Sequence, residues 1–313
     1  MSRLKSFFAG FLILLLAACD AWVTPRALPF PTPAQHDLVV LTRPGPLTYS
    51  VDDNDIAVGL EHDLAEAFAQ ELGVAVKYIV APHEEMASKI TDGGYHIAAA
   101  WLSPREDQLI QATSPIFQTR DILAQHEASL PLRELAQLSG KTVHAMANTR
   151  QALTLKRLAA EIPGLKVIEI GQGDILDLLE MLGDGKIKYV AMDANLEDIA
   201  NQFVPMLRTS LTLSDEQPIV WLLGPRPNPE LAVRASAFLE RIQHDGTLLQ
   251  LEERYFGHVR RLKQADVVKF LGEIESTLPR LRKFFQAAES VTGIDWRLIA
   301  SVAYHESHWD ANA

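Results

Sequence analysis

The chain has 313 residues, of which 48% are hydrophobic and 22% are charged. This composition excludes a disordered tail, a collagen-like fibre and a polytopic membrane protein. Its 29 Lys and Arg against 40 Asp and Glu leave a net charge of −11, which repels phosphate backbones, so we expect no nucleic-acid partner. The single cysteine, Cys19, excludes an intramolecular disulfide and a cysteine-based zinc cluster. At this length we expect two domains and part of a third.

The first 18 residues have the pattern of a secretory signal. Arg3 and Lys5 form a basic start, and residues 7–18 are an unbroken run of apolar or small residues. This run is too short to span a bilayer, because a membrane-spanning helix needs roughly 20 residues. We therefore predict a signal peptide over residues 1–18 and a periplasmic protein.

The position of Cys19 predicts a membrane anchor. The preceding Leu16-Ala17-Ala18 and Cys19 together resemble the lipobox of bacterial lipoproteins. In those proteins the signal is cleaved before the cysteine, which then carries the lipid, so the resemblance implies lipidation at Cys19 and attachment to a membrane. An ordinary signal peptide with an unrelated cysteine is the alternative interpretation.

Residues 19–35 are predicted to be a tether. They contain Pro25, Pro29, Pro31 and Pro33 and lack helical or strand periodicity. Such segments favour an extended polyproline conformation and act as semi-rigid spacers. We expect this one to hold the folded part away from the membrane.

From residue 36 to residue 257, short apolar runs alternate with amphipathic stretches, which predicts an α/β protein. Strands are predicted at residues 38–41, 74–80, 97–101, 142–146, 167–170, 189–192 and 219–223. Helices are predicted at residues 60–72, 151–162, 175–182, 230–244 and 248–255. The elements form two sets, separated before residue 142, and therefore indicate two α/β lobes.

Two stretches at the ends of this region carry a resemblance. The sequence Gly-Leu-Glu-His-Asp-Leu-Ala-Glu-Ala-Phe at residues 59–68 resembles the first-lobe signature of bacterial amino-acid-binding proteins, and Asp-Gly-Thr-Leu at residues 245–248 resembles their C-terminal signature. The resemblance implies a two-lobed periplasmic-binding-protein-like module over residues 36–257, whose lobes close on a ligand by hinge motion. We expect the chain to cross between the lobes near Gln125 and near Leu213.

A zwitterionic ligand needs a cation for its carboxylate, an anion for its ammonium and an apolar wall that excludes water. The resemblance implies that Arg105 pairs with the carboxylate and that Asp193 meets the ammonium. Thr149 starts a predicted helix, where a hydroxyl and free N–H groups favour an anion, and Tyr49 and Trp101 are candidates for the apolar walls. The alternatives are a surface charge for Arg105, a turn residue for Asp193, a helix cap for Thr149 and core packing for Trp101.

Residues 258–313 are predicted to be all-α. Apolar residues recur at helical spacing from Val267 to Phe285, and Asp295 is a suitable N-cap for a further helix. On that helix Ile299 and Val302 share one face, and Glu306 lies on the same stripe. A carboxyl group among apolar side chains stays neutral more readily, as a general acid requires. A glutamate that reaches solvent, or one paired with a cation, is the alternative.

The residues around Glu306 carry a second resemblance. Ala-Tyr-His-Glu-Ser-His-Trp at residues 303–309 resembles the Glu-Ser signature of lysozyme-like soluble lytic transglycosylases. The resemblance implies that Glu306 is the sole catalytic carboxylate of such a domain. It would protonate the glycosidic oxygen between N-acetylmuramic acid and N-acetylglucosamine, then take the proton of the C6 hydroxyl and leave a 1,6-anhydro product.

A zinc-protease helix is a rival interpretation of the same residues. That motif places its two histidines at i and i+4, with the glutamate directly after the first. Here His305 and His308 are three residues apart, and no third ligand is evident, so the spacing does not fit a zinc site. We expect no metal and no other cofactor.

The order of anchor, binding module and Glu-Ser signature resembles the membrane-bound lytic murein transglycosylase F family. This implies a peptidoglycan-cleaving enzyme at the outer membrane whose module binds an amino acid or muropeptide. Attachment to the inner membrane is the alternative, because Asp20 resembles a signal that retains lipoproteins there. Because the chain stops at Ala313, directly after the signature, we expect an N-terminal fragment that is inactive alone. The alternative is a lipoprotein receptor that delivers an amino acid to a transporter.

Overall fold

The computed structural model describes residues 28–52, 54–104, 110–257 and 264–310. The predicted signal peptide, Cys19 and Arg105 lie outside the described residues. The chain divides into two compact units, Met1–Phe117 with Pro218–Ile242 and Gln118–Gln217 with Gln243–Ala313. We call the first unit the first lobe and Gln118–Gln217 the second lobe. Across the described ranges, no helix combines the length and the apolar character that crossing a membrane requires.

The first lobe is built on a mixed five-stranded sheet in the order β4-β1-β5-β12-β6. Its strands are β1 (Leu38–Thr42), β4 (Val76–Val80), β5 (Ile97–Leu102), β6 (Phe117–Thr119) and β12 (Gln217–Leu223). Strand β1 pairs in parallel with β4 and with β5, whereas β12 is antiparallel to β5. The carboxyl ends of β1, β4 and β5 therefore lie at the same edge of the sheet. A two-stranded ribbon of β2 (Ser50–Val51) and β3 (Ala57–Val58) follows β1.

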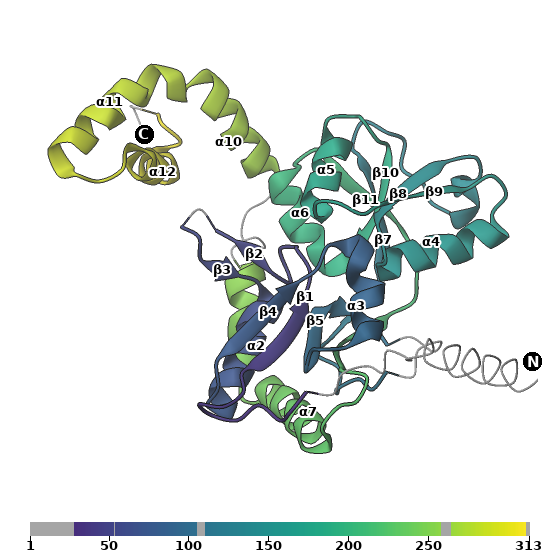
Figure 1. Cartoon of the computed structure of the whole chain (residues 1–313). Helices are drawn as coiled ribbons and strands as arrows, with labels where there is room; N and C mark the ends of the chain where they lie inside the picture. Colours follow the sequence, from purple (N-terminus) through teal and green to yellow (C-terminus); the bar gives the residue numbers. More distant parts are fainter. Residues whose placement is uncertain (1–27, 53, 105–109, 258–263, 311–313) are drawn as a thin grey trace, which may run out of the picture. The chain divides into compact units, whose positions relative to one another are not determined.

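Helices cover both faces of this sheet (Figure 1). On one face Val220 and Leu222 of β12 belong to a core with Met86 and Ile90 of α3 (Met86–Asp92). Because successive strand residues point to opposite faces, Trp221 points to the other one. There its ring packs at 5.8 Å from Phe68 of α2 (Leu60–Leu72) and at 6.2 Å from Phe238 of α7 (Pro229–His244).

Gly59 sets the start of α2. Its φ is +150°, and a Cβ atom built on it would lie 2.3 Å from the backbone oxygen of Thr48. The backbones approach so closely that only glycine fits. The glycine that opens the first-lobe signature therefore has a packing function, and the helix ends at Gly73, which has φ +70°.

The second lobe is built on a sheet in the order β11-β7-β10-β8-β9. Its strands are β7 (Asp121–His126), β8 (Thr142–Met146), β9 (Lys166–Ile170), β10 (Tyr189–Asp193) and β11 (Leu207–Thr212). Strands β9, β8 and β10 are parallel to one another, and β7 is antiparallel to both β10 and β11. The ends of β8 and β10 therefore meet the start of β7 at one edge of this sheet.

Alternating residues divide the core of the second lobe between two faces. Leu123 and Val143 pack with Leu155 of α4 (Arg150–Glu161) on one face. Ile122 and Met192 pack with a cluster on the other face, which includes residues of α5 (Ile175–Gly183) and α6 (Glu197–Phe203). In Figure 1, α4 and α5 accordingly flank the sheet on opposite sides.

The chain after α7 is helical. It forms α8 (Thr247–Glu252), a π-helical turn at Glu253–Gly257, and then α10 (Gln264–Ser276), α11 (Leu278–Thr292) and α12 (Trp296–Ser307). Helix α11 packs against both α10 and α12. The all-α character predicted for residues 258–313 is confirmed for the part that the structure describes, residues 264–310.

Two expectations from the sequence differ from the structure. Gln125 lies inside β7, so the predicted crossing there is wrong, and the division between the units falls between Phe117 and Gln118. No glycine or proline stands between Phe117 and His126 to mark the boundary in the sequence. The return crossing lies between Gln217 and Pro218, four residues after the predicted Leu213.

The described end of the predicted tether packs on the first lobe. The Pro29 carbonyl oxygen lies 2.7 Å from Nε2 of His96, and Nδ1 of the same ring accepts a hydrogen bond from the Val39 N–H at 2.8 Å. The guanidinium of Arg234 lies 5.5 Å from the centre of the Phe30 ring. Residues 28–35 are therefore held against the first lobe through His96 and Arg234.

Candidate functional site

The carboxyl ends of β8 and β10, together with the N-terminus of α4, form an edge of the second lobe. Ligands of open α/β sheets bind outside the carboxyl ends of the strands, beside helix N-termini. We define the second-lobe edge as Thr119, Asp121, Thr149, Arg150 and Asp193, since hydrogen bonds join four of these residues and Thr149 caps α4 beside them.

Thr149 is the N-cap of α4. Its buried hydroxyl oxygen accepts a hydrogen bond from the Ala152 N–H at 3.3 Å and donates to the Met146 carbonyl oxygen at 2.6 Å. The sequence-predicted position at the start of a helix is confirmed. Both hydroxyl contacts are with the protein's own backbone, so the side chain fixes the junction between β8 and α4.

Asp193 ends β10, where the sequence predicts it, and is only 3% exposed. Its Oδ1 accepts hydrogen bonds from the Thr119 hydroxyl at 2.6 Å and from the Asn195 N–H at 2.9 Å. Its Oδ2 accepts one from Nη2 of Arg150 at 2.5 Å. A cation of the same chain therefore already occupies the carboxylate that the resemblance assigns to a ligand ammonium.

Asp121 is the second carboxylate at this edge, directly opposite Asp193 in the pairing of β7 with β10. Its fully buried carboxylate accepts hydrogen bonds from Nε of Arg150 at 2.9 Å, from Nε2 of Gln151 at 2.8 Å and from the Thr154 hydroxyl at 2.6 Å. The guanidinium of Arg150 thus joins the two carboxylates.

Burial alone would lower the pKa of Arg150, but the charges of Asp193 and Asp121 outweigh it and raise that pKa above its ordinary value. The guanidinium therefore stays charged at neutral pH. Sequence reasoning missed Arg150 and Asp121. One signal was present, because an arginine in the first turn of α4 lies at the positive end of the helix dipole and needs anionic partners there.

Trp101 lies in the equivalent place in the first lobe, near the carboxyl end of β5. It has a φ of +53°, and its indole ring stacks on Phe117 with 5.3 Å between ring centres. The backbone N–H of Trp101 donates to the carboxylate of Glu61, and the backbone carbonyl oxygen of Trp101 accepts a hydrogen bond from Arg43 at 3.3 Å. The backbone of Trp101 is thus held between a buried acid and a buried base.

Glu61 is fully buried at the start of α2. Burial raises its pKa to about 8, although the hydrogen bond from Trp101 and the charge of Arg43 act in the opposite direction. Sequence reasoning treated Glu61 only as part of the first-lobe signature. The helical position of Glu61 beside Leu60 and Leu64 was the signal that it faces the core.

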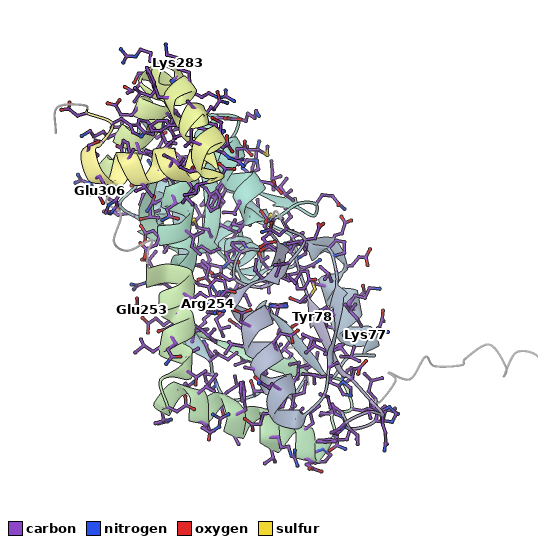
Figure 2. The ribbon with its side chains drawn as sticks, turned by 90° about the vertical axis from the view of Figure 1, so that its left-hand side faces the viewer. Lys77, Tyr78, Glu253, Arg254, Lys283 and Glu306 are labelled. Carbon is purple, nitrogen blue, oxygen red and sulfur yellow. The ribbon has the colours of Figure 1, made fainter. Side chains whose placement is uncertain are left out.

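Tyr49 is half-buried in a cluster of rings. Its ring centre lies 5.7 Å from that of His62 and 5.2 Å from that of Tyr78, whose hydroxyl donates to the His62 carbonyl oxygen at 3.2 Å. Tyr78, labelled in Figure 2, belongs to β4. Tyr49 therefore packs against α2 and β4.

Glu306 is exposed near the end of α12, with 77% of its side chain accessible (Figure 2). Val302, on the same predicted stripe, is 55% exposed. The expected burial is therefore wrong for Val302 and Glu306, whereas Ile299 of the same stripe is partly buried. Ala300 is buried, and at about 100° per residue Val302 and Glu306 lie about 200° and about 240° around the helix axis from it.

An aromatic cluster holds the end of α12 in place. The Tyr304 ring lies 4.6 Å from Phe270 of α10 and 4.8 Å from Trp309, measured between ring centres. The indole Nε1 of Trp309 donates to the Ala300 carbonyl oxygen at 2.7 Å. At the other end, Asp295 accepts a hydrogen bond from the Arg297 N–H at 2.8 Å, which confirms the predicted N-cap.

The chain matches known proteins along almost all of its length. Residues 38–258 match the family of bacterial extracellular solute-binding proteins, family 3. A protein of Nitrosospira multiformis named membrane-bound lytic murein transglycosylase F is 36% identical over 304 residues, which cover 96% of this chain and 62% of that protein. A protein of the same name from Aeromonas hydrophila is 30% identical over 312 residues, 99% of this chain and 62% of its own length.

The chain therefore spans about three fifths of the length of these curated relatives. Among solved structures, an ancestral arginine-binding protein bound to arginine superimposes with a TM-score of 0.63 at 21% identity, over 70% of this chain and 98% of that one. This confirms the two-lobed periplasmic-binding-protein fold. The chain belongs to the bacterial extracellular solute-binding proteins, family 3, and its curated relatives are named membrane-bound lytic murein transglycosylase F.

Proposed function

We propose that the protein to which this chain belongs is a peptidoglycan lytic transglycosylase, with Glu306 as its catalytic acid and base. The supporting observation is the Glu306-Ser307 pair at the end of α12, within a match to proteins named for this activity. The alignment with the Aeromonas hydrophila protein covers 99% of the chain, so it extends through Glu306, the eighth residue from the end.

One carboxyl group is sufficient for this reaction. Glu306 donates its proton to the oxygen between N-acetylmuramic acid and N-acetylglucosamine, and the C1–O bond breaks. The carboxylate formed then accepts the proton of the C6 hydroxyl as that oxygen attacks C1 and closes the 1,6-anhydro ring. No water is consumed, which distinguishes the reaction from hydrolysis by a pair of carboxylates.

The exposure of Glu306 bears on the activity of residues 1–313 alone. General acid catalysis needs a sugar positioned at hydrogen-bond distance from the carboxyl group. Among the described residues, the Glu306 carboxylate lies 3.7 Å from Nδ1 of the exposed His305 ring. We propose that residues 1–313 by themselves do not release anhydro-muropeptides.

The test compares the protein expressed from its complete gene with its Glu306→Gln variant on murein sacculi. Glutamine keeps the size of the side chain but carries no transferable proton, so release of 1,6-anhydro-muropeptides should fall ~100- to 10,000-fold. Glu275→Gln, on the exposed surface of α10, is the matched control and should leave release unchanged. Undiminished release by Glu306→Gln would remove Glu306 from the catalytic role.

We further propose that the family 3 module binds a small amino-acid-like or peptide ligand and regulates the enzyme. The support is the family itself and the polar second-lobe edge beside the N-terminus of α4. Trp101, Tyr49, Thr149 and Arg105 remain the proposed ligand contacts from the sequence. Calorimetry with amino acids and muropeptides tests this, and Arg105→Ala should weaken a measured affinity if Arg105 binds the ligand carboxylate.

A receptor that delivers an amino acid to a transporter is the second candidate. The observation that favours it is the match of residues 38–258, more than half of the chain, to solute-binding proteins. The helices α10–α12 favour the enzyme, because they lie beyond the matched module. Deletion of the gene separates the two, since a receptor's loss abolishes uptake of its amino acid, whereas an enzyme's loss reduces anhydro-muropeptide release.

Membrane attachment is proposed to occur through a lipid on Cys19. Metabolic labelling with a radioactive fatty acid should label the protein and should fail to label Cys19→Ala. Separation of the two membranes on a density gradient then decides between the outer membrane, which the family resemblance of the sequence implies, and the inner membrane, which Asp20 favours. A Cys19→Ala variant that still sediments with membranes would contradict a lipid anchor.

A further inference from the structure

Arg150 joins two buried carboxylates, and one of them is Asp193, to which the family resemblance assigns the ammonium of a free amino acid. Its side chain is 9% exposed, and those of Asp121 and Asp193 are 0% and 3% exposed. Nε contacts Asp121 at 2.9 Å and Nη2 contacts Asp193 at 2.5 Å. The guanidinium belongs to the first residue of α4, directly after the N-cap Thr149.

A ligand ammonium bound to Asp193 would share this carboxylate with the guanidinium. To pair with Oδ2 it would have to compete with an arginine whose other nitrogen is tied to Asp121. The arginine is covalently part of the lobe and loses no translational freedom on pairing, whereas the ligand does. The guanidinium would also repel the ammonium, which weakens the attraction that the two carboxylates exert on it.

An acylated nitrogen has none of these difficulties. An amide N–H carries no net charge, needs a single acceptor and is not repelled by a neighbouring guanidinium. At Oδ1 of Asp193, the Thr119 hydroxyl and the Asn195 N–H show that the same carboxylate already accepts neutral donors alongside Arg150. The edge therefore suits a ligand whose amino nitrogen is neutral.

We propose that Arg150 is a specificity-determining residue, which makes the module select ligands with an acylated amino nitrogen over free amino acids. This inference rests on the proposed ligand binding by the module and names its chemical class. Peptides of the cell wall whose first residue is amide-linked to muramic acid belong to this class, as does any N-acyl amino acid or N-acyl peptide.

The test uses three matched probes that differ only at the nitrogen, L-alanyl-D-isoglutamine, its N-acetyl form and its N-acetylmuramyl form. Calorimetry on the purified whole chain measures the affinity for each. We expect both acylated probes to bind at least ~10-fold more tightly than the free amine, since an ammonium without its anion is left desolvated and unpaired. The N-acetyl form isolates the nitrogen from contacts made by the sugar.

Variants then assign the preference to Arg150. Arg150→Gln removes the cation and leaves Asp193 to an incoming ammonium, so the preference for the acylated probes should fall at least ~10-fold or reverse. Arg150→Lys retains a cation and should retain the direction of the preference. Circular dichroism establishes whether each variant is folded. If Arg150→Gln is not folded, Asp193→Asn is measured instead. Asp193→Asn should keep the wild-type preference, because in this proposal Asp193 does not bind the ammonium.

The outcomes separate this inference from the function on which it rests. Tighter binding of the free amine by the wild type, or loss of free-amine binding in Asp193→Asn, would overturn the role of Arg150 while ligand binding stands. An unchanged preference in folded Arg150→Gln would overturn it as well. Absence of binding for all three probes and for a panel of free L-amino acids would overturn both proposals.

Discussion

The backbone N–H of Trp101 donates a hydrogen bond to the carboxylate of Glu61, a residue 40 positions earlier in the chain. Trp101 has a left-handed φ of +53°, which a non-glycine residue adopts only when its surroundings hold it there. Glu61 at the N–H and Arg43 at the carbonyl oxygen supply that restraint. The buried acid of α2 therefore determines how Trp101 is presented at the end of β5.

This contact predicts a pH dependence of stability. The pKa of Glu61 is raised from 4.5 to about 8 in the folded protein. Between these values the folded state holds a proton that the unfolded state releases, so the free energy of unfolding falls as pH rises, and the loss is complete above about pH 8. Urea unfolding at pH 5, 7 and 9 measures this.

Glu61→Gln should remove that dependence. Glutamine keeps an acceptor for the Trp101 N–H but has no charge to bury, so we expect the variant to be about 1–3 kcal/mol more stable than the wild type at pH 9. Glu71→Gln is the matched control on the same helix, since Glu71 is exposed and pairs with Arg241 at the surface. Equal pH profiles for wild type and Glu61→Gln would contradict the assignment.

His96 predicts a loss of stability on the acid side. Burial lowers the pKa of His96, although the hydrogen bond to Pro29 acts in the opposite direction, and His36 adds repulsion. In the unfolded state His96 binds a proton near pH 6.5, whereas in the folded state it binds one only at lower pH. The free energy of unfolding therefore falls as pH falls below about 6.5. In a His96→Phe variant this dependence should vanish.

The same variant should be destabilised at pH 7.5. Removal of the ring nitrogens leaves the Val39 N–H and the Pro29 carbonyl oxygen without these partners, at a cost of about 1–3 kcal/mol. Proteolysis of residues 28–35 should also become faster than in the wild type, because His96 holds Pro29. An unchanged digestion rate would show that other contacts suffice to hold this segment.

Phe68 is predicted to be essential to the core of the first lobe. It is fully buried and lies 5.2 Å from Phe238 and 5.8 Å from Trp221, measured between ring centres. Phe68→Ala should lower the free energy of unfolding by about 3–5 kcal/mol, through lost burial and the cavity left behind. Phe203→Ala, at a site 64% exposed, is the control and should change it by less than about 0.5 kcal/mol.

Trp309 is predicted to order the helix that carries Glu306. Its indole packs on Tyr304, Phe270 and Phe285, and the indole N–H donates a hydrogen bond to the Ala300 carbonyl oxygen. Trp309→Ala should increase hydrogen exchange across α12 at least ~10-fold, because the opening free energy falls by more than about 1.4 kcal/mol. Phe284→Ala, at a site 61% exposed, is the matched control and should leave exchange unchanged.

Much of the fold was accessible from local sequence patterns. The helix at residues 60–72 and the strand at residues 142–146 were predicted with the bounds that the structure shows. Both are bounded by local signals, apolar periodicity and the closing glycine of α2 in the first case and a preceding Ser139-Gly140 in the second. Strands β6, β7 and β11 and helices α3 and α6 were missed; β6 has three residues, and α3 and α6 have seven each, too few for a clear helical period.

The sequence alone determined the two-lobed α/β class, the family signatures, the cap of α4 by Thr149 and the place of Asp193 at the end of β10. It did not determine what surrounds these residues. Arg150, Asp121 and Asp193 are brought together only by the pairing of β7 with β10, and Glu61 meets Trp101 only when α2 packs on β5. Such contacts join positions 29–43 residues apart. Capping and helical periodicity act only within a few residues of the chain. Tertiary packing alone therefore decides which charges are paired and which helix face is buried.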